Sequence, residues 1–269
     1  MNKNRQLEIE KLADYVRDEC KVTDYGIQNI FDAADKLKYR VIRLPIGEDL
    51  FLGFSLIKES ERIIFSNSSL ILSREIFTVA HEIGHHKLHL SEQGVTMIKD
   101  NDFNNNDGKE IEANYFAACL LMPKEKVEKF IRFELDDKEI YRWNGLDIAR
   151  IQTTFYVSYD MVLNRLDSLN ILNSDLKEKL IMEKFENKVT RLLKTINGNI
   201  DLCKPSNVEN IPAEYIEWVI TNYNNKLISL ESLEKAISYI GLTSDDLENL
   251  SEEDGEDDEN IEDLLGRIE

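Results

Sequence analysis

The chain has 269 residues, of which 42% are hydrophobic, a formal net charge of −19, and three cysteines, Cys20, Cys119 and Cys203. This length allows one large or two modest domains with an ordinary core, and the strong negative charge argues against a protein that grips nucleic acid through its phosphates. The odd number of cysteines without metal-ligand spacing, and the lack of a recognisable signal peptide or membrane span in the sequence, predict a cytoplasmic protein without membrane contacts.

The spacing of apolar residues changes twice within the first ninety residues, from helical to strand-like and back to helical. Apolar residues at helical spacing predict helices over residues 7–16 and 27–37. Short stretches of β-forming residues then predict strands over 41–44, 51–57 and 62–65, separated by turns. Helical spacing returns after Ser73, a residue type favoured at helix N-caps, and predicts a helix to about His89 with Glu75 in its first turn.

All four histidines of the chain lie in that last helix, at His81, His85, His86 and His89, and His81-Glu82-Ile83-Gly84-His85 is an HExxH motif. Positions i and i+4 of a helix lie about 40° apart around its axis. Two imidazoles can therefore reach one metal ion, and Glu82 can reach a water bound to that ion. The competing interpretation is a histidine-rich surface helix without a metal. His86, rotated by about 100° from His85, is predicted to be a surface or outer residue.

A catalytic zinc ion usually takes three protein ligands and a water. His89 lies about 12 Å along the axis from His81 and cannot share the ion with it. A second helix is predicted over residues 110–123, where Glu112 shares a face with Phe116 and Cys119 while Glu110 points elsewhere. A carboxylate on a buried face is costly unless it is paired or ligating, so Glu112 is predicted as the third ligand.

The remaining chain is predicted to be helical. Residues 148–166 form either a packed helix pair or a DNA-reading pair that presents Arg150 and Arg165, and the net charge favours packing. Further helices are predicted over 176–196, 213–223 and 230–240. Residues 245–269 hold 13 acidic side chains and one basic side chain, which predicts a disordered tail that either solubilises the protein or covers a basic surface.

Two segments together resemble the ImmA/IrrE family of zinc metallopeptidases. The first is residues 77–85 with Leu88 and His89, and the second is Glu112-Ala113-Asn114 followed by residues 116–123. The resemblance extends over roughly residues 7–172. By match of position it implies His81, His85 and Glu112 as ligands of one Zn²⁺ per chain, and Glu82 as the catalytic acid–base residue.

The predicted fold is α+β: a zincin-like core over 1–135, a helix–turn–helix-like segment over 136–173, a helical region over 174–247 and an acidic tail over 248–269. The resemblance implies an intracellular endopeptidase that cleaves a helix–turn–helix repressor and so relieves repression of mobile-element or stress genes. Strand 62–65 is predicted to align the substrate by β-addition. Two alternatives stay open: a non-catalytic zincin-fold binding module, antitoxin-like or anti-repressor, and a direct DNA-binding regulator. The oligomeric state does not follow from the sequence.

Overall fold

In the computed structural model, the described residues are 1–47, 52–58, 61–90, 97–100, 107–212, 214–238 and 243. They fall into two compact units, Met1–Glu209 and Asn210–Glu269. The predicted acidic tail lies outside the described residues. No helix among the described residues is long and apolar enough to cross a membrane.

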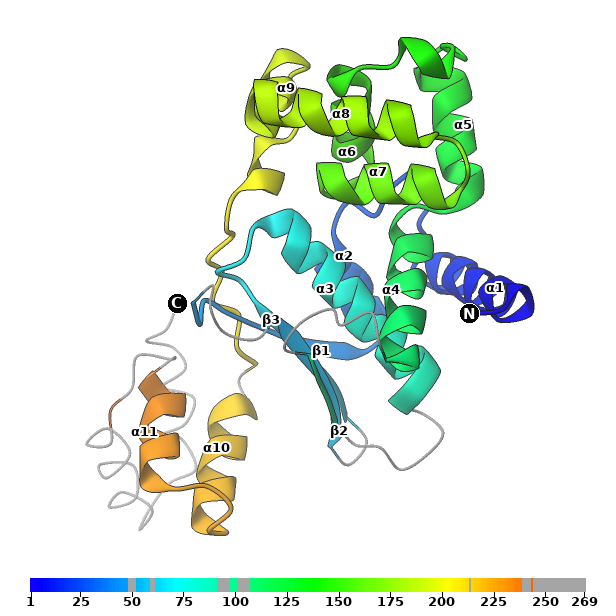
Figure 1. Cartoon of the computed structure of the whole chain (residues 1–269). Coiled ribbons are helices and arrows are strands. Elements are labelled where there is room, and N and C mark those ends of the chain that lie inside the picture. Colours follow the sequence, from blue (N-terminus) through cyan, green and yellow to red (C-terminus); the bar gives the residue numbers. More distant parts are fainter. Residues whose placement is uncertain are drawn as a thin grey trace. The chain divides into compact units, whose positions relative to one another are not determined.

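A four-stranded sheet lies at the base of the first unit (Figure 1). Its strands are β1 (Tyr39–Leu44), β2 (Gly53–Lys58), β3 (Glu61–Asn67) and β4 (Met97–Asp100). Their order is β1-β3-β2-β4, with β1 parallel to β3, and β2 antiparallel to both β3 and β4. Strand β3 is therefore hydrogen-bonded on both sides. The prediction that residues 62–65 align a substrate by β-addition is wrong, because β3 has no open edge.

Helix α3 (Leu72–His85) packs on the sheet and continues into the π-helical turn η1 (His86–Leu90). Ser73 is not its N-cap, because the cap position is Ile71, which makes no side-chain capping bond. Instead, the Leu72 amide donates to the carbonyl of Lys204 over 2.7 Å, so a distant segment satisfies one of the open amides of the first turn.

A buried ion pair seats the start of α3 on the sheet. The Arg43 guanidinium from β1 donates to both oxygens of Glu75, over 2.8 and 2.9 Å, and the Ser206 hydroxyl donates to the same carboxylate over 2.7 Å. Glu75 is fully buried, so this paired, hydrogen-bonded geometry offsets the cost of removing its charge from water.

Helix α4 (Gly108–Leu121) packs against α3 on one side and against α1 (Lys3–Glu19) on another. Asp107 caps α4 by accepting from the Lys109 amide. The short helix α2 (Ile30–Lys36) lies beside β1 and α3. Apolar side chains from all of these elements form one continuous core.

The chain then forms a group of helices, most of which contribute to that core, drawn at the top of Figure 1. They are α5 (Lys124–Glu134), η2 (Ile140–Arg142), α6 (Gly145–Phe155), α7 (Tyr159–Ser168), α8 (Ser174–Asn187), α9 (Val189–Thr195) and η3 (Ile200–Cys203). The predicted helix over 176–196 is two helices, because Lys188 breaks it with φ +57°. The α+β fold with a zincin-like core and a helical region behind it is confirmed.

Helices α6 and α7 occupy the predicted helix–turn–helix-like segment. Arg165, which the DNA-reading alternative required on the surface, is buried. Its Nε donates to the Met122 carbonyl over 2.9 Å, and its guanidinium reaches Cys119 Sγ. Arg165 therefore ties α7 to the end of α4 and is not available to contact DNA.

The second unit contains α10 (Glu214–Asn224) and α11 (Leu230–Ser238), which match the predictions over 213–223 and 230–240. Val219, Leu233 and Ile237 form its small apolar core. The domain boundaries predicted at residues 135, 173 and 247 stay predictions.

Candidate metal centre

His81 and His85 lie on the face of α3 that turns toward α4, and their side chains, like that of Glu82, are fully buried. The Nε2 atoms of His81 and His85 lie 2.9 Å apart. Helical geometry explains this approach, because the two residues are four positions apart on one helix face. The sequence-predicted pairing of these two histidines is therefore present in the structure.

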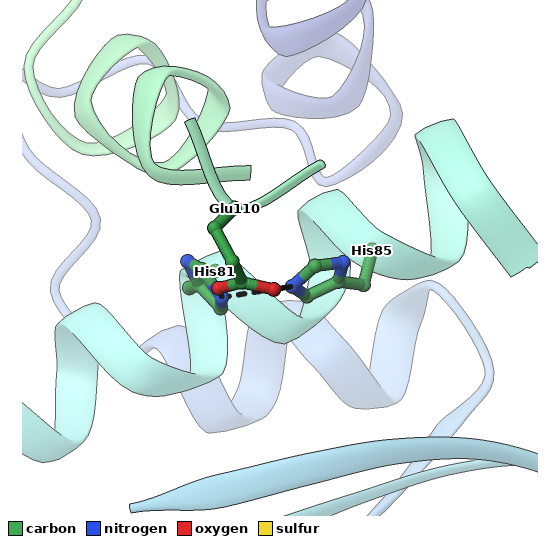
Figure 2. A group of neighbouring side chains, drawn as sticks. All are labelled: His81, His85 and Glu110. Atoms are coloured by element: carbon green, nitrogen blue, oxygen red, sulfur yellow. Dashed lines mark hydrogen bonds and ion pairs between the residues drawn. The ribbon is translucent and has the colours of Figure 1, made fainter. Parts of the chain in front are cut away.

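The carboxylate that meets this pair belongs to Glu110 rather than Glu112. Figure 2 shows Glu110 reaching from α4 toward both imidazoles. Its Oε2 lies 3.2 Å from His81 Nε2, and its Oε1 lies 3.2 Å from His85 Nε2. Within the described part of the chain, these three side chains form the one group of histidine, cysteine or acidic residues arranged to hold a metal ion.

Close contact between α3 and α4 accounts for the position of Glu110. A Cβ on Gly84 would lie 3.0 Å from Phe116 and 3.3 Å from the backbone of Ala113. Because Gly84 has no side chain and Ala113 has a small one, the helix backbones approach closely there. Glu110 lies one turn before Ala113 on the same face, which brings its carboxylate to the histidines.

The donor geometry fits a small divalent ion. A tetrahedral ion with metal–ligand distances of about 2.0–2.1 Å separates its ligand atoms by roughly 3.3 Å, close to the separations of 2.9–3.2 Å observed here. His81 Nδ1 lies 3.0 Å from Asn114 Oδ1, an acceptor, so Nδ1 carries the proton and the Nε2 lone pair faces the group. Nitrogen lone pairs that point toward a carboxylate form a site in which a cation between them would be bound by all of these groups.

The histidines also explain the ionisation of Glu110. Burial alone would raise the pKa of this carboxyl, but its interactions with the His81 and His85 side chains outweigh that effect and hold the pKa well below its usual range. Glu110 is therefore charged at neutral pH, which is the form that ligates a metal.

Glu82, the predicted catalytic residue, is fully buried between α3 and β2. The hydroxyl of Ser55, also fully buried, donates a hydrogen bond to its carboxylate. Two residues away on β2, a Cβ on Gly53 would lie 2.6 Å from the Thr78 side chain and 3.1 Å from Glu82 Oε1. Glycine at this position therefore lets β2 approach the motif closely enough for Ser55 to reach Glu82.

Glu112, the predicted third ligand, turns toward α1 instead. Its two oxygens accept from Nε and NH2 of Arg5 over 2.9 and 2.7 Å, and its Oε2 lies 3.3 Å from His89 Nε2. The hydrogen bonds from Arg5 lower the pKa of Glu112; burial opposes them and His89 adds to them, so that the pKa lies below its usual value. The expectation that Glu112 meets the histidine pair is corrected by this geometry.

His86, another histidine of the motif helix, has structural partners of its own. His86 is buried, not on the surface: its Nε2 donates to the Ile63 carbonyl over 3.1 Å, and its ring lies on Tyr39. Burial lowers the pKa of His86 to about 4, so the ring is neutral. On α4, the neighbouring Tyr115 donates to the Glu10 carboxylate over 2.5 Å and so bonds to α1.

Sequence reasoning missed Glu110, Ser55, Asn114 and Arg5 as members or neighbours of this group. One signal for Glu110 was present, because Gly84 and Ala113 are the small residues expected where two helices touch. Nothing in local periodicity indicated Ser55 or Arg5, which reach the group only through tertiary packing.

Comparisons with known proteins agree with this geometry. A sequence model of the peptidase M78 family, described as the IrrE N-terminal-like domain, matches residues 34–167. The match includes the histidine pair, Glu82 and Glu110. An uncharacterized immunity region protein 2 of Bacillus phage phi105 is 26% identical over 133 residues, which is 49% of this chain and 83% of the phage protein. Through residues 34–167, the chain belongs to the peptidase M78 family of IrrE N-terminal-like domains.

Proposed function

We propose that this protein is a zinc-dependent endopeptidase that cleaves a helix–turn–helix transcriptional repressor and thereby relieves repression of mobile-element or stress genes. The observation that carries the proposal is the convergence of His81, His85 and Glu110 beside Glu82, within a domain of a peptidase family. Membership of that family supports hydrolysis of a peptide bond. The phage relative, named for an immunity region, supports a regulatory setting.

His81, His85 and Glu110 are the residues that would hold the metal, which leaves a fourth position open as in catalytic zinc sites. When bound, the metal supplies Lewis acidity, polarising the scissile carbonyl and lowering the pKa of water. Glu82 accepts the proton of the attacking water and passes it to the leaving amine. Ser55 orients the Glu82 carboxylate for both transfers.

Strand β4 is the best placed element to align an extended substrate. It forms one end of the sheet among the described strands and pairs with β2, the strand that carries Ser55. A substrate strand added at the outer edge of β4 would extend the sheet at the end where β2, the strand that contacts Glu82, lies. Main-chain hydrogen bonds to β4 would hold the substrate backbone.

The test uses the helix–turn–helix proteins encoded in the same operon or mobile element as this chain. The zinc-loaded protein is expected to convert one of them into two fragments that mass spectrometry assigns to a single cut. A chelator should stop the reaction and added zinc should restore it, while casein should be cut poorly. If all these proteins stay intact with the zinc-loaded enzyme, the proposal is wrong.

Ser55→Ala is expected to slow cleavage because it removes the hydrogen bond that orients Glu82. Small misplacements of a reacting group cost up to about 10²-fold in rate, so we expect kcat to fall by roughly 10- to 100-fold with KM and zinc content little changed. Steady-state kinetics on the identified repressor measure this effect. The matched control is Ser66→Ala, another fully buried strand serine that does not contact Glu82; equal kcat in the two variants would exclude the orienting role of Ser55.

A further inference from the structure

A continuous series of polar side chains leads from His85 out to the N-terminal helix. His85 Nδ1 lies 3.0 Å from His89 Nδ1, and His89 Nε2 lies 3.3 Å from Glu112 Oε2. Glu112 in turn accepts two hydrogen bonds from Arg5 of α1, over 2.9 and 2.7 Å. The series ends at a half-exposed arginine whose own helix lies outside the residues matched by the family model.

Hydrogen positions along this series follow from its two ends. If His85 Nε2 ligates a metal, its proton must be on Nδ1, which then donates to His89 Nδ1. His89 must consequently carry its own proton on Nε2, where Glu112 is the acceptor. Arg5 can only donate, and it does so to both oxygens of Glu112. Each donor therefore meets an acceptor, and the ring of His85 is fixed in the tautomer that a metal requires.

The two histidines of the pair differ in the origin of their outer partners. His81 is oriented by Asn114, which lies on α4 close to Glu110 in sequence. His85 is oriented by His89, and His89 depends on Glu112, which is held by Arg5 from a different helix. The docking of α1 on α4 is thus linked to the metal centre through His85.

The competing interpretation of Arg5 and Glu112 is a simple surface ion pair between two helices. That interpretation does not account for His89, which is 9% exposed and has one ring nitrogen on His85 and the other on the same Glu112 oxygen that Arg5 NH2 contacts. A purely interhelical pair needs no buried imidazole between it and a metal ligand. Outer partners that hold ligating histidines typically contribute a factor of 10–100 in metal affinity.

We propose that Arg5, Glu112 and His89 are positioning residues that fix His85 for metal binding, so that helix α1 forms part of the metal centre. This inference rests on the metal site of the proposed function. It adds a dependence on an element outside the matched family domain, and it concerns metal retention rather than cleavage.

The experiment measures zinc affinity of the full chain by competition with a fluorescent chelator. His89→Phe fills a similar space without hydrogen bonds and should weaken zinc binding by about tenfold or more. Arg5→Ala should weaken it by a smaller factor, and Arg5→Lys should recover part of the loss. The matched control is Lys11→Ala, which removes one exposed positive charge from the same helix and should bind zinc like the wild type.

A double-mutant cycle separates positioning from general destabilisation. If Arg5 acts through His89, the Arg5→Ala, His89→Phe double variant should bind zinc no more weakly than His89→Phe alone. The Arg5–Glu112 pair is partly exposed and contributes little to folding, so the melting temperature of the zinc-free Arg5→Ala variant should stay close to that of the wild type.

Two results would overturn the inference: zinc affinities of Arg5→Ala and His89→Phe equal to that of Lys11→Ala, or additive losses in the double variant. Either result would leave the proposed function intact, because the wild type would still bind zinc. A wild-type chain that binds no zinc would instead refute the metal site of the proposed function itself.

Discussion

Glu82→Gln is expected to abolish repressor cleavage, while the variant folds, binds zinc and binds the repressor like the wild type. Glutamine has nearly the same shape as glutamate, and its carbonyl oxygen can still accept from Ser55, so the packing between α3 and β2 is preserved. What is lost is the group that accepts a proton from water. General base catalysis contributes about 10²–10⁴-fold, and we expect kcat to fall by at least that range. The measurements are fragment formation by mass spectrometry and zinc content by elemental analysis.

The same variant decides between the peptidase and the binding module. A module that acts by contact alone needs no proton acceptor at position 82, so wild type and Glu82→Gln would then relieve repression equally in cells and leave the repressor intact. Glu128→Gln, on the exposed face of α5, serves as the control for removal of one acidic group. If Glu82→Gln relieves repression as strongly as the wild type, the peptidase proposal is wrong and the protein acts as a binding module.

The histidine pair was predictable because its geometry is local. Two residues four positions apart on one helix share a face in any fold, so HExxH alone determines that His81 and His85 can meet. The order of helices, strands and metal-binding helix also follows from periodicity, and the structure agrees with it.

Strand order was not predictable in the same way. Alternation of side chains indicates a strand but does not tell which neighbours it has. A usable signal was present in Ile63-Ile64-Phe65, since a continuous apolar run is typical of a strand covered on both faces. These three residues are indeed buried, and β3 lies inside the sheet rather than at its edge.

The choice between Glu110 and Glu112 failed for a related reason. Helix α4 is covered by α3 on one side and by α1 on another, so more than one of its faces is apolar. Glu112 shares a face with Phe116 and Cys119, as predicted, but this placement brings it to Arg5 of α1. Periodicity identifies buried faces, whereas the identity of the covering element is a tertiary property.

Replacing Glu110 and Glu112 in turn by alanine tests which of them is the third metal ligand. The two assignments predict opposite orders of zinc affinity for the two variants. If Glu110 is a ligand, Glu110→Ala removes one of three donors from a buried site, and the loss of zinc affinity should exceed the roughly 10–100-fold that an outer partner costs. Glu112→Ala should cost no more than that outer-partner range, because it disturbs only His89 and through it His85. Competition with a chelator measures both variants on the same scale.

The zinc-free forms of both variants provide the control, since similar melting temperatures would show that the loss of affinity is not a loss of fold. Glu110→Asp refines the test: it keeps the charge but shortens the reach by one methylene, so its affinity should fall between those of the wild type and Glu110→Ala. If Glu112→Ala removes the zinc while Glu110→Ala retains it, the third ligand is Glu112. Helix α4 would then have to turn its Glu112 face from Arg5 toward the histidines when the metal binds.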